Sequence, residues 1–286
     1  DLSGHSERNR LAVFSYKPSP IQISWLGLPM TTGVPEMDYV IGDPYALPQE
    51  FENQFTEGIL RLPESYLCFT PPDSSVEVGA LPALRNGYLT FASFNNLSKM
   101  NNKVVEVWSN ILKALPTAKL LLKTKQLSDP NISRQTEERF SDHGIKADRL
   151  LLKATLDDRD EHLATYNEVD IALDTFPYPG VTTSVEANWM GAPVLAHKGN
   201  TFLSATATSI ANNAGLDNWV ALDAQDYVNK AVAFASNLDR LALLRSSLRN
   251  RVLASPLFDS PRFAKNFGDA LYRMWSEHLE KNAGNQ

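Results

Sequence analysis

The chain has 286 residues, of which 43% are hydrophobic and 21% charged, a composition typical of a globular protein with a substantial core. Its formal net charge of -6 argues against a surface built to neutralise nucleic-acid phosphates, so no nucleic-acid partner is expected. No run of 18 consecutive apolar residues predicts a membrane span, and the single cysteine, Cys68, favours a cytoplasmic protein without intrachain disulfides.

The first part of the chain predicts little regular structure. A helix is expected over residues 8–15, a strand over 21–26 and a glycine turn over 27–33. Residues 36–87 are predicted to be irregular, because prolines that break long elements recur at Pro44, Pro48, Pro63, Pro71, Pro72 and Pro82.

From Tyr88 onward, short apolar runs alternate with helical patterns. The expected strands cover residues 89–94, 119–122, 149–152, 169–173, 192–195 and 219–222. Helices are expected between them and then over 224–236, 238–253 and 262–279. This alternation, with short connections, predicts an α/β fold, a Rossmann-like parallel sheet with helices on both faces.

Three strand ends carry polar residues, and ligands of open α/β sheets bind beyond the carboxyl ends of the strands. The first segment, residues 93–99, places Asn95, Asn96 and Lys99 just after a strand. Two amides and an ammonium group there are suited to contact phosphate oxygens. The alternative is an asparagine-rich turn that caps the following helix.

The second segment, residues 155–162, is an acidic run that opens a helix, and helix capping explains most of it. Asp158-Arg159-Asp160 also matches the aspartate-x-aspartate pattern of metal-dependent transferases, but matches of three residues are common by chance. His162 lies one turn into the helix, where its ring is suited to pack against a base or ribose. The alternative for His162 is a partly exposed structural histidine.

The third segment, residues 173–186, carries the strongest signal. Gly180, Thr182 and Thr183 stand where a strand gives way to a helix, and the free N–H groups of a helix N-terminus bind anions. The glycine is expected to let a ligand approach the backbone, and Glu186, one turn later, is suited to accept both hydroxyls of a ribose. The alternative is a capping box formed by Thr183 and Glu186, which needs no ligand.

Together these segments resemble the catalytic region of the O-linked N-acetylglucosamine transferases and their SPINDLY relatives. The likeness spans almost the whole chain and also includes residues 1–5, 18–29, 37–39, 189–194 and 254–258. It implies a glycosyltransferase-B fold, in which two Rossmann-like lobes hold a sugar nucleotide between them without a metal or other cofactor. It further implies a nucleotide-sugar donor and a protein acceptor, with no membrane partner.

The resemblance also implies roles for the residues on the first two segments. Lys99 is the catalytic candidate that neutralises the departing diphosphate, with Asn96 beside it where eukaryotic relatives carry glutamine. His162 is expected near the uridine. Arg159 stands where the animal enzymes have a nucleotide-contacting lysine, so the positive charge is kept.

On the third segment, the resemblance implies that Thr182 and Thr183 hold the diphosphate at the helix end, beside Gly180. Glu186 is expected to bind the ribose where the relatives have aspartate. Two departures favour a pocket that has lost its function: Val181 replaces a histidine of the animal enzymes, and Ala205 stands where relatives usually have an arginine.

The same resemblance suggests how the chain is divided. Residues 1–35 are expected to be a remnant of the N-terminal catalytic lobe, and residues 36–87 a connecting segment. Residues 88–260 are expected to form the C-terminal, nucleotide-sugar-binding lobe, and residues 261–286 a helix that crosses back toward the other lobe. The rest of the N-terminal lobe and the superhelical repeat region that precedes it in the family are expected partners.

The first functional hypothesis is inverting transfer of N-acetylglucosamine from UDP-GlcNAc to protein Ser or Thr hydroxyls. A second keeps the enzyme class with GDP-fucose as donor, as in SPINDLY, and a third is a non-catalytic nucleotide-binding or scaffold module. No general base is assigned, and residues 1–286 alone are expected to bind nucleotide without efficient transfer.

Overall fold

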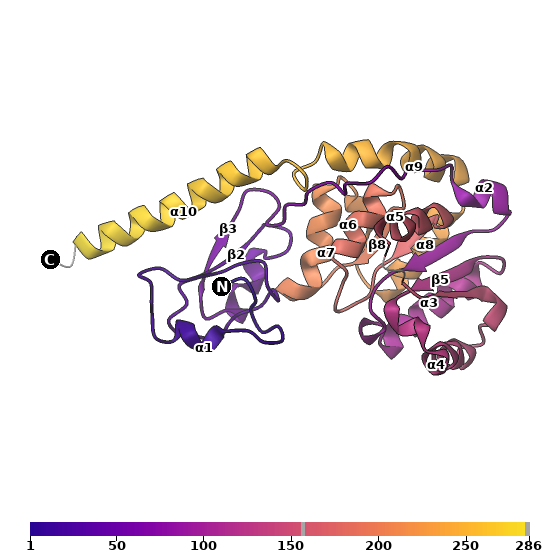
Figure 1. Cartoon of the computed structure of the whole chain (residues 1–286), viewed down its shortest axis with the longest axis horizontal. Helices are drawn as coiled ribbons and strands as arrows, with labels where there is room; N and C mark the ends of the chain where they lie inside the picture. Colours follow the sequence, from indigo (N-terminus) through magenta and orange to yellow (C-terminus); the bar gives the residue numbers. More distant parts are fainter. Residues whose placement is uncertain (156–157, 284–286) are drawn as a thin grey trace.

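The computed structural model describes residues 1–155 and 158–283, and its larger unit is a six-stranded parallel sheet (Figure 1). The strand order is β6-β5-β4-β7-β8-β9. The strands are β4 (Thr90–Ser93), β5 (Lys119–Lys123), β6 (Leu150–Lys153), β7 (Ile171–Leu173), β8 (Val194–His197) and β9 (Val220–Ala221). The central strands are apolar and buried because helices cover both faces of the sheet. The predicted α/β class and parallel sheet are confirmed.

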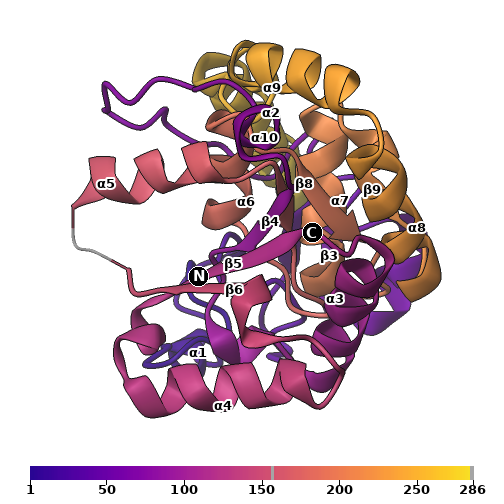
Figure 2. The ribbon, with the colours of Figure 1, turned by 90° about the vertical axis from the view of Figure 1, so that its right-hand side faces the viewer.

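Helices cover the two faces in separate groups (Figure 2). On one face α3 packs against both α4 and α8, and on the other α6 packs against α7 and α9. The helices are α3 (Asn102–Ala114), α4 (Pro130–Ser141), α5 (Arg159–Ala164), α6 (Thr182–Trp189), α7 (Phe202–Asn213), α8 (Ala224–Ala235) and α9 (Leu238–Leu253). An apolar stripe along α3, which includes Val104, Trp108 and Ile111, is buried.

A second, smaller parallel sheet contains β1 (Ile23–Ser24), β2 (Tyr39–Gly42) and β3 (Gly58–Arg61) in that order. Two of these strands lie within residues 36–87, so the expectation that this stretch is irregular is wrong. The prolines of the stretch flank its strands rather than interrupt them, which is why they do not prevent pairing. The segment also contains α2 (Pro82–Asn86).

The first helix is also shorter than expected. The helix predicted over residues 8–15 is reduced to α1 (Leu11–Phe14), and the strand predicted over 21–26 is reduced to β1. The strand β1 lies at the edge of the smaller sheet and pairs with β2 alone.

The last helix, α10 (Ser260–Ala283), leaves the larger unit and packs on the smaller sheet (Figure 1). Ala270 and Met274 of α10 are buried against Ile41 and Leu60 of that sheet. The ring of Trp25 lies 4.8 Å from that of Phe267 between ring centroids. The helix expected over residues 262–279 therefore joins two parts of the chain that are far apart in sequence.

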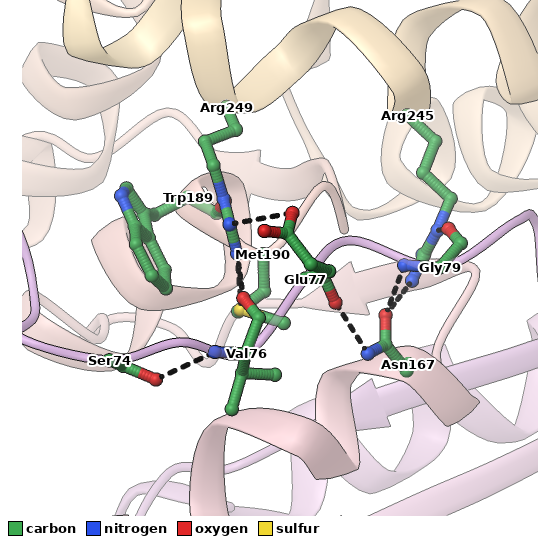
Figure 3. A network of polar contacts seen from close by, with 9 residues as sticks. All are labelled: Ser74, Val76, Glu77, Gly79, Asn167, Trp189, Met190, Arg245 and Arg249. Carbon is green, nitrogen blue, oxygen red and sulfur yellow. Dashed lines mark hydrogen bonds and ion pairs between the residues drawn. The ribbon is translucent and has the colours of Figure 1, made fainter. Parts of the chain in front are cut away.

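The chain returns to the larger unit through residues 74–79, whose main chain is held by arginines of α9 (Figure 3). Arg249 donates from Nη2 to the carbonyl of Val76 at 2.9 Å. Arg245 donates from Nε to the carbonyl of Gly79 at 2.8 Å. Because these bonds go to backbone oxygens, they fix the path of this segment whatever its side chains are.

Arg245 is expected to be a large contributor to stability, because it is only 1% exposed. Its guanidinium also donates to the carbonyl of Val169 at 2.6 Å, and burial lowers its pKa to about 10, so it stays charged at neutral pH. Arg245→Met would leave these carbonyls unpaired and should lower the free energy of unfolding by about 2 kcal/mol in urea denaturation. Arg240→Met, on an exposed position of the same helix, is the control. Equal stability of the two variants would contradict this role.

Candidate functional site

The strand order of the larger sheet reverses between β4 and β7, which are neighbours although they are far apart in sequence. Chain segments leave these two strands toward opposite halves of the sheet, and this opens a crevice beyond their carboxyl ends. The segment after β4 is the first of the three predicted polar segments, and the segment after β7 is the third. The fold therefore brings these two segments together.

The loop after β7 is organised around Asp174, a carboxylate that is 1% exposed. Its Oδ1 accepts hydrogen bonds from the N–H of Thr175 at 2.9 Å and from the N–H of Gly180 at 2.7 Å. Both ends of the loop are thus held by one side chain. Burial raises the pKa of Asp174 to about 6, and the hydrogen bonds and the Lys99 ammonium oppose that rise.

Gly180 is required here for a reason that differs from the expected one. A Cβ at this position would lie 2.8 Å from Oδ1 of Asn95 and 2.9 Å from Oγ of Ser184, and closer still to Oγ1 of Thr183. The N–H of Gly180 already donates to Asp174. The glycine therefore allows three protein side chains to converge, whereas the sequence argument had reserved this space for a ligand.

The N-terminus of α6 has no side-chain cap. Thr183 lies inside the helix, and its Oγ1 donates to Oδ1 of Asn95 at 3.3 Å. The capping box that was the alternative explanation for Thr183 and Glu186 is therefore absent. The first N–H groups of α6 have no acceptor within the helix, which leaves them available to an anion.

The same helix end faces a cavity of about 440 Å³ between the two units. Thr182, which is exposed, and Val181 line it from the larger unit, together with Tyr178. Gly27 and Leu28 line it from the side of the smaller sheet. A volume of this size is within the range of small-ligand sites.

Lys99 approaches the loop after β7 from the 3₁₀ helix η2 (Leu97–Lys99) that follows β4. Its Nζ donates to the carbonyl of Pro179 at 2.8 Å and lies 4.1 Å from the centroid of the Tyr178 ring. Burial lowers the pKa of this half-buried ammonium, and the charge of Asp174 opposes the shift. Lys99 thus contacts the loop after β7, and Thr183 follows that loop in the first turn of α6. A shared contact of both residues with a diphosphate stays a prediction.

The two asparagines before Lys99 have different positions. Asn96 is exposed, and its Oδ1 accepts from the N–H of Ser98 at 2.9 Å, so it caps η2 as the alternative explanation proposed. Asn95 instead points into the crevice, where its Nδ2 donates to Asp174 at 3.2 Å. The role that the resemblance implies for Asn96 stays a prediction, whereas the geometry favours Asn95 for contact with the crevice. The alternation of side chains is lost after the strand ends, so the sequence did not separate the two.

The second polar segment meets the third through Glu186. Its carboxylate lies 3.4 Å from Nε2 of His162 and 3.7 Å from Nη2 of Arg159, both on α5. The side chains of Glu186 and His162 are only 14% and 19% exposed, whereas Arg159 is largely exposed. The His162 ring packs edge-on against Phe94, at 5.6 Å between ring centroids. These three predicted residues therefore form one cluster beside the crevice.

The aspartate-x-aspartate match has a structural explanation. Asp158 caps α5, since its Oδ1 accepts from the N–H of Glu161 at 2.8 Å. Asp157 lies outside the described residues. Within residues 1–155 and 158–283, no group of three or more His, Cys, Asp or Glu side chains is placed to hold a metal ion.

Sequence reasoning did not single out Lys123, a buried cation at the carboxyl end of β5 that is 2% exposed. Its Nζ donates to Oγ1 of Thr165 at 2.8 Å and to the carbonyl of His162 at 3.4 Å. Burial lowers its pKa, and Glu186 is among the acidic groups that oppose the shift. The sequence did contain an indication of this buried cation, because Lys123 directly follows three leucines at the end of a strand expected to be buried.

The two departures from the resemblance lie in different places. Val181 lines the cavity, next to the end of α6. Ala205 is buried within α7, where its neighbour Ser204 forms a capping box with Thr201. A longer, charged side chain at position 205 would not fit this buried environment without rearrangement.

The strand order reverses between β4 and β7, an uncapped helix follows β7, and a lysine contacts the loop before that helix. This arrangement is typical of Rossmann-like lobes. Comparison with known proteins narrows this class. The chain belongs to glycosyl transferase family 41, whose family model matches residues 1–70 and 74–267.

Its relatives include proteins described as probable UDP-N-acetylglucosamine–peptide N-acetylglucosaminyltransferases. The SPINDLY proteins of Solanum lycopersicum and Arabidopsis thaliana are 37% and 36% identical over 98% of this chain. The SEC protein of Arabidopsis thaliana is 29% identical over 97% of it. The chain spans about 30% of the length of these curated relatives.

Among solved structures, a mutant O-GlcNAc transferase of Thermobaculum terrenum superimposes with a TM-score of 0.91 and 36% identity. The match covers 99% of this chain and 53% of that one. A sucrose-phosphate synthase from Thermosynechococcus elongatus, at a TM-score of 0.55 and 18% identity, shares the fold alone. The expected glycosyltransferase-B fold is thereby confirmed. None of the helices within the described ranges is long and apolar enough to cross a membrane.

Proposed function

We propose that this chain is the donor-binding part of a protein O-glycosyltransferase that transfers N-acetylglucosamine from UDP-GlcNAc to Ser or Thr hydroxyls. The observation that carries the proposal is the uncapped N-terminus of α6, with Lys99 held against the preceding loop. Two positive partners converge there, the free N–H groups of the helix and an ammonium group. A diphosphate is the part of a sugar nucleotide that needs both.

In the proposed complex, the diphosphate lies across the first turn of α6. Thr182 adds a hydroxyl donor to the helix amides, Thr183 turns its hydroxyl from Asn95 to the diphosphate, and Lys99 turns from the Pro179 carbonyl to a phosphate oxygen. Asn95 takes the role first proposed for Asn96, because its side chain already contacts Thr183. As the diphosphate leaves, its growing negative charge meets donors that are already in place.

The nucleoside is proposed to lie beside the Glu186 cluster. Glu186 is an acceptor for both ribose hydroxyls, and His162 offers an imidazole face for the base. Arg159, exposed on α5, is suited to the outer side of the same cluster. The 3.4 Å contact between His162 and Glu186 supports this arrangement, since it orients the carboxylate without burying all of its lone pairs.

The proposed reaction is an inverting displacement. The acceptor oxygen forms a bond to the anomeric carbon while the bond from that carbon to the diphosphate breaks on the opposite face. The diphosphate leaves with the electron pair, and the hydroxyl proton passes to a general base, to which no residue is assigned. The proposal needs no metal, because Lys99 and the α6 amides supply the positive charge. A cytoplasmic location is proposed on the cysteine content alone.

The proposed division of the whole protein follows the resemblance. Residues 88–260 are the nucleotide-sugar-binding lobe, and residues 1–35 belong to the lobe that faces the acceptor. Residues 39–61 add β2 and β3 to the same small sheet as β1, so the boundary expected at residue 35 is wrong and residues 1–61 belong to one unit. Residues 62–87 connect the two lobes, and residues 261–286 cross back toward the first. The packing of α10 on the smaller sheet supports this division. Further parts of the protein, including a repeat region, are proposed partners in acceptor binding.

GDP-fucose is the alternative donor. The chain is more similar to the SPINDLY proteins than to the SEC protein, at 37% against 29% identity, and the resemblance links the SPINDLY branch with GDP-fucose. The contacts proposed for the diphosphate and the ribose serve either nucleotide. The nucleobase therefore has to be identified by experiment.

Calorimetric titration and thermal shift with UDP, GDP, ADP and TDP test the proposal. A nucleotide at 100 times its dissociation constant should stabilise the chain by about 2.7 kcal/mol, because it binds only the folded state. UDP is expected to produce the largest shift. Stronger binding of GDP would replace UDP-GlcNAc by GDP-fucose as the donor. No shift with any of the four would favour the scaffold hypothesis, in which the pocket has lost its function.

A further inference from the structure

The buried carboxylate of Asp174 joins the loops that follow β4 and β7. Besides the two amides of its own loop, it accepts from Nδ2 of Asn95 at 3.2 Å and from Oγ of Ser184 at 3.3 Å. Asn95 follows β4, and Ser184 belongs to the first turn of α6. One side chain therefore sets the position of both loops and of the helix end between them.

Asp174 does not contact the proposed ligand itself, and acts on the proposed diphosphate site through neighbouring side chains. Asn95, oriented by Asp174, accepts the hydroxyl of Thr183 at 3.3 Å. Lys99 donates to the carbonyl of Pro179, which immediately precedes Gly180. A change at Asp174 is thus transmitted to both sides of the diphosphate site.

When ionised, the same carboxylate is a buried negative charge next to the residues proposed to bind the diphosphate. The ammonium of Lys99 is the cation whose charge acts on it. Tyr227 of α8 donates its hydroxyl to the Asp174 carbonyl at 3.1 Å, and Tyr166 donates to the carbonyl of Thr183 at 3.1 Å. The ring of His197 of β8 stacks on the ring of Phe176, at 4.7 Å between ring centroids. Burial raises the pKa of Asp174 to about 6, close to neutral pH.

The hydrogen-bond pattern of Asp174 is compatible with either protonation state. Its Oδ1 accepts from three N–H groups, so this oxygen remains an acceptor in both states. Its Oδ2 accepts from the hydroxyl of Ser184, a group that can either donate or accept. A proton on Oδ2 is therefore accommodated by rotation of one hydroxyl.

We propose that Asp174 is a positioning residue for the diphosphate, which keeps the loop after β7 in shape and takes up a proton when the diphosphate binds. The proposal rests on the proposed function, because its ligand is the diphosphate of a sugar nucleotide. The physical reason is that a bound diphosphate makes the ionised carboxylate less favourable than the neutral acid.

The direction of the pH effect follows from linkage. Binding raises the pKa of Asp174 above its value in the free protein, so the complex holds more protons than the free chain. Affinity therefore increases as the pH falls from 8 toward 6, and levels off below the pKa of the free protein. A rise of one pKa unit on binding corresponds to a tenfold change in affinity across this window.

The experiment measures UDP-GlcNAc binding to the whole chain by calorimetry between pH 5.5 and 8.5, with GDP-fucose in parallel. Both probes are diphosphate diesters, whose phosphates do not titrate in this range. Buffers of different ionisation enthalpy report the proton uptake directly. The wild-type chain is expected to bind about fivefold more tightly at pH 6 than at pH 8, because half of Asp174 is already protonated in the free chain at pH 6, with proton uptake near neutral pH.

Asp174→Asn keeps an oxygen acceptor and removes the titrating group. Its affinity is expected to be independent of pH and, at pH 8, about tenfold higher than that of the wild type. Asp170→Asn is the matched control, because Asp170 is equally buried at the other end of β7 and accepts from the amides of Ala83 and Thr90. His162→Gln removes the imidazole contribution, and proton uptake is expected to persist in it.

Proton uptake that remains in Asp174→Asn, or an affinity of this variant below that of the wild type at every pH, would overturn the inference alone. Failure of both probes to bind the wild type would overturn the proposed function as well. If Asp174→Asn does not fold, the carboxyl ¹³C shift of Asp174 in the wild type decides the question. Its titration midpoint is expected to rise when nucleotide is added, and an unchanged midpoint would refute the inference.

Discussion

Replacing Lys99 by alanine is expected to weaken nucleoside-diphosphate binding by about 100-fold, which corresponds to about 2.7 kcal/mol. The ammonium group is half-buried and is held at the loop by the Pro179 carbonyl, so little rearrangement precedes its contact with a phosphate oxygen. Its partial burial strengthens the charge-assisted hydrogen bond that it would form. Calorimetric titration of the wild type and the variant with UDP measures the effect.

Lys103→Ala is the matched control for Lys99→Ala. Lys103 lies one turn further along the chain, on α3, where its ammonium pairs with Glu106 at 3.1 Å. The control is expected to bind UDP like the wild type, and both variants should keep the melting temperature of the wild type. An unchanged dissociation constant for UDP in Lys99→Ala would contradict the proposal that the Lys99 ammonium contacts the diphosphate.

Replacing Gly180 by alanine is expected to abolish nucleotide binding, with a loss of about 100-fold or more. The added methyl group would lie 2.8 Å from Asn95 and 2.9 Å from Ser184, so the loop and the first turn of α6 must separate. This movement would pull the N–H of Gly180 away from Asp174 and displace the helix amides from Lys99. The dissociation constant for UDP and the melting temperature should both change.

Gly268→Ala provides a comparison within the same protein. An added Cβ at Gly268, in α10, meets no atom within 4 Å, and alanine favours helix, so this variant should bind UDP normally and be at least as stable as the wild type. Wild-type affinity in Gly180→Ala would mean that the tight packing around Asp174 is not what holds the anion site together.

The architecture of the larger unit was accessible from the sequence because its signals are local. Apolar runs such as Leu120–Leu122 are recognisable as buried strands, and the periodic stripe on α3 specifies a helix. Strict alternation of strands and helices then predicts a parallel sheet. The polar residues after β4 and β7 were located for the same reason, since parallel strands end at a common edge.

The partners of individual side chains were not accessible in this way. The sequence pointed to Asn96, whereas the fold turns Asn95 into the crevice and leaves Asn96 as a turn cap. It offered a capping box for Glu186, whereas α5 brings His162 against that carboxylate. These outcomes depend on the direction of a side chain after a strand has ended, which no periodicity specifies.

The amino-acid sequence by itself determined the class of the larger unit, the edge of the sheet where polar groups gather, and the residue types suited to an anion. Only the tertiary structure decided that Asp174 ties the two loops together, that Gly180 makes room for protein atoms, and that residues 36–87 contribute two strands to a second sheet. The reason is the sequence separation of the interacting residues, because helix and strand patterns arise from neighbours a few residues apart. The contacts that build the site join residues about 80 positions apart, such as Asn95 with Asp174 and Lys99 with Pro179.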